Sequence, residues 1–312
     1  MRIALMMPGQ GSQAVGMGRD LADADAAVRE LYARADEILG VPLSRFCFEG
    51  PEETLTRTEN AQPAILLHSW ATWTSLPDGI RDAVVVGAGH SLGEFSACLA
   101  AGALRFEDAL RLVRRRGELM ARAGEERPGT MAALLGLSVA EVTAVCEAAS
   151  GPAGVVVPAN FNAPDQVVVS GDVAAVEAAR EEALAAGARR AVRLNVSGAF
   201  HSPLMARARE GLQAALADVE VVDPAFPVVA NASARPVRTG REIREQLVRQ
   251  LTSPVRWVES VAAMRDESPG AWLELGPGRV LAGLLRRMDR SLPAHAAGDV
   301  EEIAVLEEAL DV

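Results

Sequence analysis

The hydrophobic pattern of this chain alternates short apolar runs with longer stretches whose apolar residues recur every three or four positions. The short runs predict buried strands, and the recurring positions predict amphipathic helices that pack on them. We expect strands at 3–7, 84–87, 131–137, 155–157, 166–170, 190–196, 227–231 and 271–275. We expect helices at 21–39, 64–76, 92–101, 107–123, from 138 onward, 172–186, 206–216, 241–251 and, as a solvated acidic helix, 300–312. This alternation predicts an α/β fold.

The middle of the chain has a pattern of its own. A break in composition at 124–129, Gly-Glu-Glu-Arg-Pro-Gly, precedes a β-α-β-β-α-β order of elements that ends near 196. That order is typical of a ferredoxin-like unit. We therefore predict a larger α/β core from residues 1–128 and 197–312, with a small subdomain inserted at 129–196.

The most informative stretch is the turn Gly89-His90-Ser91-Leu92-Gly93, between the strand at 84–87 and the helix at 92–101. A G-x-S-x-G turn in this context projects the serine hydroxyl, and the N-terminus of the following helix stabilises negative charge. Ser91 is therefore a candidate nucleophile. The alternative is an ordinary turn whose glycines serve close packing.

Arg116 falls on the buried stripe of the helix at 107–123, whereas Arg114 and Arg115 lie to its sides and are expected in solvent. A guanidinium that points inward is costly unless an anion or several hydrogen bonds meet it. Two interpretations stay open at this point: a structural salt bridge, or a ligand that bears a carboxylate.

His201 is a candidate base, because it is the only histidine flanked by turn residues where the chain re-enters the core. His90 lies in the turn itself and is expected to point away from Ser91. His68 is expected on a helix and His295 in a polar tail.

Composition narrows the function classes. The net charge of −11 argues against nonspecific nucleic-acid binding, and the absence of lysine excludes a lysine base, a Schiff base and a P-loop. The three cysteines are far apart and the four histidines lack metal-ligand spacing, so we expect reduced thiols, no metal and no cofactor. No apolar run approaches about 20 residues, and Met1-Arg2 leads directly into a strand. We therefore expect no membrane segment and a cytoplasmic protein.

The loop Gly9-Gln10-Gly11 follows the first strand but lacks the third glycine of a dinucleotide fingerprint, and no acidic residue ends a second strand about 20 residues later. We therefore reject a Rossmann fold. The loop remains a candidate ligand site at the carboxyl end of a strand.

Several motifs in order carry a family resemblance: Gly9-Gln10-Gly11-Ser12-Gln13, Gly89-His90-Ser91-Leu92-Gly93-Glu94, Arg116, Ala199-Phe200-His201-Ser202, Gln250 and Gly276-Pro277-Gly278. With them the chain resembles the malonyl-CoA:acyl-carrier-protein transacylases, including the discrete acyltransferases of polyketide synthesis. The resemblance covers nearly the whole chain. It implies an α/β-hydrolase-like core with an inserted ferredoxin-like lobe.

The resemblance also implies roles for individual residues. Ser91 would be acylated, and His201 would serve as general base and later as general acid, oriented by the backbone carbonyl of Gln250 in place of a carboxylate. The backbone amides of Gln10 and Leu92 would form the oxyanion hole. Arg116 would pair with the free carboxylate of the malonyl group.

Substrates and partners follow from the same resemblance. Malonyl-CoA would be the donor and the phosphopantetheine thiol of an acyl carrier protein the acceptor, in a ping-pong reaction of a monomer. Phe200 resembles the malonyl-selective members, in which bulk next to the acyl group disfavours a methyl branch. Phe95 departs from the tyrosine of many relatives, with no consequence assigned.

Docking of an acidic carrier on an acidic chain needs a local basic patch. The pairs Arg189-Arg190 and Arg286-Arg287 are candidates, and both are also compatible with ordinary solvated surface. Two rival functions remain: an acyl hydrolase that uses the same serine and histidine, and a non-catalytic docking subunit. The sequence does not separate fatty-acid from polyketide carriers.

Overall fold

The structure is a computed structural model that describes residues 1–152 and 154–310. Its centre is a six-stranded sheet in the order β10-β9-β1-β2-β7-β8, parallel except for the β7–β8 pair. The strands are β1 (Ile3–Met7), β2 (Val84–Gly89), β7 (Val228–Ala230), β8 (Arg235–Val237), β9 (Ala271–Leu275) and β10 (Ala294–Ala297). Because Met7 pairs with Gly89, the loops after β1 and β2 leave the sheet side by side.

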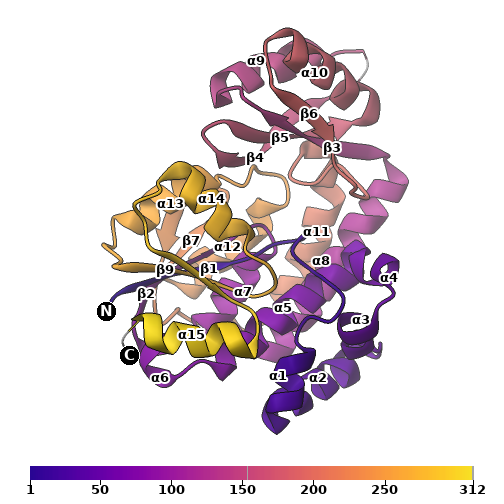
Figure 1. The fold of residues 1–312 in the computed structure, drawn as a ribbon. Helices are drawn as coiled ribbons and strands as arrows, with labels where there is room; N and C mark the ends of the chain where they lie inside the picture. The colour runs from indigo at the N-terminus through magenta and orange to yellow at the C-terminus, as the bar shows by residue number, and fades with distance from the viewer. Residues whose placement is uncertain (153, 311–312) are drawn as a thin grey trace.

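Helices cover both faces of this sheet (Figure 1). The alternating residues of β1 show the two sides: Ile3, Leu5 and Met7 join one core, and Ala4 and Met6 join the other. The first core is closed by α5 (Thr58–Ser75), α7 (Gly93–Ala100) and α8 (Phe106–Glu126), and the second by α13 (Trp257–Arg265) and α14 (Val280–Met288). The centre of the sheet is therefore buried on both sides, which leaves its carboxyl edge for a site.

A second, antiparallel sheet lies above the first in Figure 1, in the order β4-β5-β3-β6. Its elements run β3 (Gly129–Leu135), α9 (Val139–Ala149), β4 (Val156–Ala163), β5 (Gln166–Asp172), α10 (Val173–Ala185) and β6 (Arg190–Arg193). Ala132, Leu134, Val167 and Val169 pack with α9 and α10 in a separate core. The observed order of elements is the one that the sequence predicts for this segment, and we call it the small unit.

The small unit is tied to the large sheet by backbone contacts. Val255, in the loop before α13, donates to the carbonyl of Ala159 in β4, and the amide of Phe161 donates to the carbonyl of Val255, both at 2.8 Å. The chain enters and leaves the small unit at adjacent points. Gly124, before the unit, lies so close to Ser197, after it, that a Cβ added at Gly124 would collide with the Ser197 carbonyl. The loop around Val255 is therefore fixed from both units.

The remaining helices surround the large sheet. They are α1 (Arg19–Ala24), α2 (Ala26–Leu39), α3 (Leu43–Glu49), α4 (Glu52–Thr56), α6 (Asp78–Asp82), α11 (Ala206–Ala217), α12 (Gly240–Gln250) and α15 (Val300–Leu310), with a short 3₁₀ turn at Pro203–Met205. Within the described ranges, no helix is long and apolar enough to cross a membrane.

Two predicted helices have other bounds. The helix expected at 21–39 is two helices, because the Asp25 side chain accepts a hydrogen bond from the Ala27 amide and starts α2. The helix expected behind Pro63 begins instead at Thr58 and contains this proline. Proline has no amide hydrogen, so it leaves the carbonyl of Glu59 without a helical partner, and Arg114 Nη1 donates to it at 3.1 Å. Arg114 is therefore half-buried rather than solvated.

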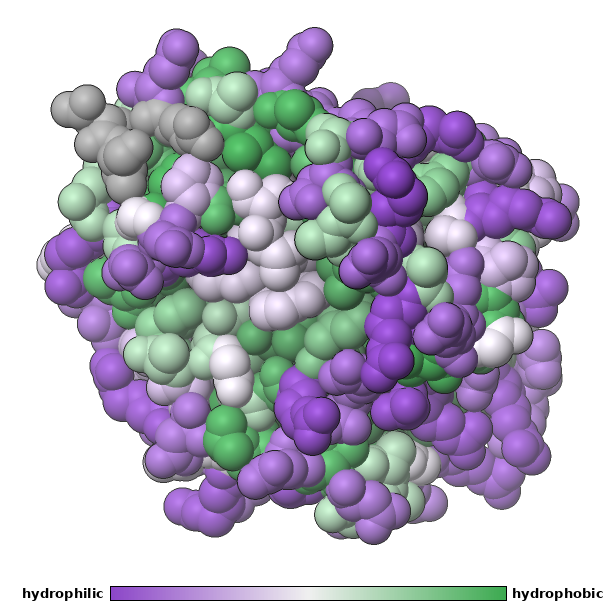
Figure 2. All heavy atoms as spheres, turned by 90° about the horizontal axis from the view of Figure 1, so that it is seen from below, coloured by the Kyte–Doolittle hydropathy of each residue, from purple (hydrophilic) through white to green (hydrophobic). Residues whose placement is uncertain are grey.

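The prediction of a solvated helix at 300–312 is wrong for one face of α15. Ile303, Leu306 and Leu310 of α15 are buried, while Val305 is exposed. Residues 311–312 of that prediction lie outside the described residues. Figure 2 shows this lower side of the molecule, where hydrophobic residues gather in the middle and hydrophilic ones lie along the edges.

Several strands have other bounds than predicted: β2 and β5 end two residues later, and β3 begins and ends two residues earlier. β4 is longer than the expected 155–157, and β6 ends three residues before 196. β8 and β10 were not predicted, and His295, expected in a polar tail, lies in β10.

Candidate active site

Ser91 lies in a sharp turn between β2 and α7. Its φ of 52° is in the left-handed region, which is uncommon for any residue but glycine. A Cβ at Gly89 would collide with the backbone of Gly93, and a Cβ at Gly93 would collide with the carbonyl of Met7. The two glycines therefore let the elbow pack against the end of β1 and expose the Ser91 hydroxyl.

The Ser91 hydroxyl meets His201. The distance from Ser91 Oγ to His201 Nε2 is 2.7 Å, and His201 Nδ1 lies 3.1 Å from the carbonyl oxygen of Gln250 and 3.2 Å from that of Ser253. Only acceptors face Nδ1, so Nδ1 carries the hydrogen and Nε2 accepts the serine proton. Backbone carbonyls thus orient the imidazole in the place where a triad uses a carboxylate.

The environment of His201 keeps its ring neutral. Burial is the main cause that lowers the pKa of His201 to about 3, and the nearby positive charge of Arg116 lowers it further. At neutral pH the ring is a free base whose lone pair faces the nucleophile.

Arg116 comes from α8 and is only 1% exposed. Its Nη1 donates to Gln62 Oε1 at 2.6 Å, and its Nη2 donates to Gln250 Oε1 at 2.8 Å and to Ser91 Oγ at 3.0 Å. Its Nε has no partner in the described part of the chain, and the ring of Phe95 lies under the guanidinium, 5.6 Å from its carbon.

The charge of Arg116 is not neutralised by direct contact. Among the described residues, the hydrogen-bond partners of Arg116 are Gln62, Gln250 and Ser91, and none of them is a carboxylate. Burial lowers the pKa of Arg116 to about 10, which still leaves it protonated at neutral pH. The structure therefore does not contain the salt bridge that the sequence left open, and a buried positive charge faces the nucleophile.

Three further residues build the site, and the sequence motifs predict no role for them. Glu94 is 2% exposed, and its Oε2 accepts from Gln250 Nε2 at 2.7 Å and from the Asn231 amide at 3.0 Å. The Asn231 side chain accepts from the Ser91 amide and donates to the Gly89 carbonyl, both at 2.7 Å. Gln62 holds Arg116. Asn231 follows β7 at the carboxyl edge of the sheet, a position that could have marked it as a candidate.

Gln10 and Leu92 lie beside the elbow. A Cβ at Gly9 would collide with the carbonyl of His90, so the loop after β1 is in contact with the turn that carries Ser91. Within the described part of the chain, the backbone amides of Gln10 and Leu92 donate to no protein group. Two such donors next to a nucleophile are available for a developing oxyanion.

Phe200 and His90 flank the pair of catalytic candidates. Phe200 is buried next to His201, with its ring against Gly198. His90 turns away from Ser91, as the sequence predicts: its Nε2 lies 2.8 Å from Asn162 Oδ1 in β4, and its ring packs beside Trp257.

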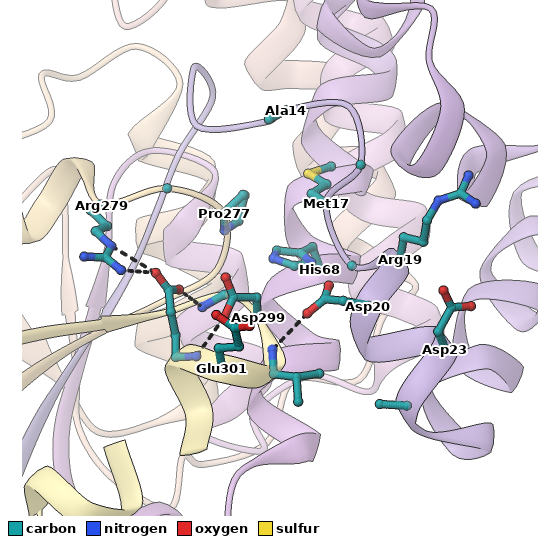
Figure 3. A pocket seen from close by; sticks show the side chains of 17 residues that line it. Ala14, Met17, Arg19, Asp20, Asp23, His68, Pro277, Arg279, Asp299 and Glu301 are labelled. Atoms are coloured by element: carbon teal, nitrogen blue, oxygen red, sulfur yellow. Dashed lines mark hydrogen bonds and ion pairs between the residues drawn. The ribbon is translucent and has the colours of Figure 1, made fainter. Parts of the chain in front are cut away.

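A cavity of about 970 Å³ lies elsewhere, between α1 and the loops after β9 and β10 (Figure 3). His68 and several acidic residues line it, and neither Ser91 nor His201 does. Burial lowers the pKa of His68 to about 4, and its Nδ1 lies 3.3 Å from the hydroxyl of Tyr32. No group of residues that could hold a metal ion occurs in the ranges that the structure describes.

A smaller hollow of about 500 Å³ adjoins the site. Gln10, Thr58 and Ser197 line it together with residues of α4. Gln10 Nε2 donates to Thr58 Oγ1 at 3.2 Å, so this hollow begins at the loop that flanks the elbow.

Comparison with known proteins identifies the family of this chain. The family model for the acyl transferase domain matches residues 5–307. This chain belongs to that acyl transferase family. The family resemblance predicted from the sequence motifs is therefore confirmed.

Relatives of this acyl transferase include two named malonyl CoA-acyl carrier protein transacylase. The one from Bacillus subtilis is 43% identical over 97% of this chain and 95% of its own length, and the one from Escherichia coli K12 is 42% identical over 97% and 98%. An acyl-carrier-protein-S-malonyltransferase from Bartonella henselae superposes with a TM-score of 0.94 at 40% identity, covering 100% of both chains. A malonyl-transacylase solved with its type II polyketide acyl-carrier protein gives 0.93 at 40% identity, covering 99% of this chain and 100% of that one.

Proposed function

We propose that this acyl transferase moves a malonyl group from coenzyme A to the phosphopantetheine thiol of an acyl carrier protein through a Ser91 ester. The observation that carries this proposal is the buried guanidinium of Arg116, which has no carboxylate partner in the described residues and lies 3.0 Å from the nucleophile. A carboxylate on the acyl group is the complement of that charge. The names of the relatives support the same substrate and acceptor.

In the first half-reaction, Ser91 Oγ attacks the thioester carbonyl while His201 Nε2 takes its proton. The amides of Gln10 and Leu92 stabilise the oxyanion, each by about 3 kcal/mol. The carbon–sulfur bond then breaks, and His201 returns the proton to the coenzyme A thiolate. The product is a malonyl ester of Ser91.

In the second half-reaction, the carrier thiol gives its proton to His201 Nε2 and its sulfur attacks the ester carbonyl. The ester bond breaks, and the proton passes from His201 to Ser91 Oγ. Arg116, held by Gln62 and Gln250, binds the malonyl carboxylate in both halves, and Phe200 limits bulk next to it.

We infer that the large unit is an α/β-hydrolase-like core and that the small unit is ferredoxin-like, with boundaries at 1–128, 129–196 and 197–312. In support, the first strand of the small unit lies between its third and fourth strands. The monomeric state, the cytoplasmic location and the independence from a cofactor remain predictions.

We also propose a docking surface for the carrier. The two arginine pairs that the sequence left separate converge on Asp165, at the turn between β4 and β5: Arg189 pairs with its Oδ2, and Arg287 Nη2 donates to its Oδ1 at 2.9 Å. Two arginines pair with this one carboxylate, and their exposed sequence neighbours Arg190 and Arg286 add positive charge, which suits an acidic carrier.

The test follows label from radiolabelled malonyl-CoA into acyl-enzyme, free malonate and malonyl-carrier. We expect a stable acyl-enzyme that transfers its label when a carrier is added, and a Ser91→Ala variant that takes up none. Rapid release of label to water with no transfer to the carrier would indicate the acyl hydrolase. If intact mass spectrometry never detects a covalent acyl mass on Ser91, the result favours the hypothesis of a non-catalytic docking subunit. Parallel assays with a fatty-acid and a polyketide carrier identify the pathway.

A further inference from the structure

Glu94 is a buried carboxylate that the proposed reaction does not use. It lies in the first turn of α7, three residues after the nucleophile, and its Oε2 accepts both hydrogen bonds that the structure gives this side chain. One comes from the Gln250 side chain and the other from the Asn231 backbone. Both donors belong to residues that also contact the elbow.

The first hydrogen bond fixes the orientation of the Gln250 amide. Arg116 can only donate, so it requires the amide oxygen, and Glu94 Oε2 is the acceptor of its hydrogen bonds, so it requires the amide nitrogen. The Gln250 Nε2 group also donates to the Ser91 carbonyl at 2.8 Å. Glu94 and the Ser91 carbonyl therefore both hold the amide nitrogen, in the orientation that directs the amide oxygen to Arg116 Nη2.

The second hydrogen bond fixes Asn231. The amide nitrogen of Asn231 donates to Glu94, while its side chain clamps the elbow at the Ser91 amide and the Gly89 carbonyl. One oxygen of Glu94 thus sets the positions of both the nucleophile turn and the support of the arginine.

We propose that Glu94 is a positioning residue for acyl-group selection: its Oε2 holds Gln250 and Asn231 so that Arg116 and Ser91 keep the spacing that a malonyl group requires. This inference rests on the proposed function, in which Arg116 binds the substrate carboxylate. Glu94 itself does not touch the reacting atoms.

The role of the oxygen can be separated from the role of the charge. Because both hydrogen bonds end on a single oxygen, the Glu94→Gln variant can place its amide oxygen there and keep both contacts without the charge. The Glu94→Asp variant keeps the charge, but its side chain is one methylene shorter and draws the oxygen away from both donors. A positioning role therefore predicts that Glu94→Gln keeps the selection for malonyl and that Glu94→Asp loses it. A counter-ion role predicts the reverse.

The experiment measures kcat/KM for loading of Ser91 with malonyl-CoA and with acetyl-CoA, and compares their ratio. We expect Glu94→Asp to lower the malonyl:acetyl ratio by roughly 10-fold or more, since residues in one hydrogen-bond network couple strongly. We expect Glu94→Gln to keep the ratio within about 3-fold of the parent value, because a substitution that preserves its hydrogen bonds changes the energy of its neighbours only slightly. The loss with aspartate should lie in malonyl loading.

Glu274→Gln is a matched control. Glu274 is also a fully buried glutamate with two backbone donors on its carboxylate, the amides of Leu281 and Ala282 at 3.0 and 2.8 Å, but it lies on β9 and caps α14. Its replacement changes stability without changing the malonyl:acetyl ratio.

Two outcomes overturn the inference: a parental ratio in Glu94→Asp, or a loss of the ratio in Glu94→Gln with retention in Glu94→Asp. An Arg116→Ala variant measured alongside distinguishes the two proposals. If it keeps the parental ratio, the proposed carboxylate site is wrong. If it loses the ratio while both Glu94 variants keep it, only the role of Glu94 is wrong.

Discussion

Arg116 donates from Nη2 to Ser91 Oγ at 3.0 Å, so the same oxygen that must attack the substrate is already a hydrogen-bond acceptor. With that lone pair occupied, the hydroxyl hydrogen is directed toward His201 Nε2, 2.7 Å away. The cation that we assign to the acyl carboxylate therefore also sets the direction of the first proton transfer.

Replacing Arg116 tests its role in selection. In Arg116→Ala, we expect malonyl loading to fall at least about 30-fold, because removing one partner of a buried charge pair costs about 2–5 kcal/mol. Acetyl loading should fall much less, so uncharged acyl groups gain in relative terms. Burst-phase intact mass spectrometry measures both, with the exposed Arg115→Ala as control. Unchanged malonyl kinetics would remove Arg116 from the site.

The low pKa of His201 predicts the pH dependence of loading. Since burial and Arg116 lower the pKa of His201 to about 3, the folded enzyme keeps a neutral base at pH values where a free histidine is protonated. The titration of His201 should therefore produce no inflection near pH 6.5 in single-turnover loading. An inflection near pH 6.5 in the loading rate of the parent enzyme would contradict this.

The same shift predicts how stability depends on pH. Between about pH 6.5 and pH 3 the unfolded chain binds a proton at His201 that the folded chain does not, so its contribution to stability is complete above pH 6.5 and declines as the pH falls. Urea unfolding at pH 7.5, 5.5 and 4.5 should show a steeper loss for the parent than for His201→Gln. Raised carboxyl pKa values at Glu94 and Glu274 act in the opposite direction in both proteins, so the comparison isolates His201.

Charge reversal tests the docking surface. Arg190→Glu with Arg286→Glu leaves the two ion pairs on Asp165 in place and reverses the charge of their neighbours. We expect transfer to the carrier to fall about 10-fold and to become less sensitive to salt, because steering by surface charge is screened by ions. Loading from malonyl-CoA should fall less. Arg45→Glu, on α3 at the lower right of Figure 1 and away from the small unit, is the control. Carrier transfer with unchanged rate and salt dependence would refute this surface.

Phe200 provides a test of steric selection. Phe200→Ser should raise loading with methylmalonyl-CoA relative to malonyl-CoA by about 10-fold, within the 1–3 kcal/mol that one methyl group supplies in discrimination. Competition between the two thioesters, read by mass on Ser91, measures the ratio. If it stays at the parental value, another wall of the pocket excludes the branch.

The sequence predicted the parts of the site that local pattern encodes. Ser91 is marked by glycines on either side and by the strand and helix around it, and Arg116 is marked by its phase on an amphipathic helix. The sequence did not predict site roles for Glu94, Asn231 and Gln62. Their contacts in the site join residues more than 50 positions apart, and no local periodicity shows such contacts.

The errors in the fold have similar causes. A proline usually marks a helix start, but α5 continues through Pro63 because the carbonyl that the proline leaves free accepts a hydrogen bond from Arg114 on another helix. The strands β8 and β10 have three and four residues, too few to show a period.

The pairing of β4 with Val255 limits how this enzyme can be engineered. Ser253, two residues before Val255, supplies one of the carbonyls that orient His201. A chimaera that exchanges the inserted segment between relatives must therefore reproduce the edge of β4, or the transplanted piece will disturb the catalytic base from a distance. The edge of β4 and the loop at 253–255 are best exchanged together, as one cassette.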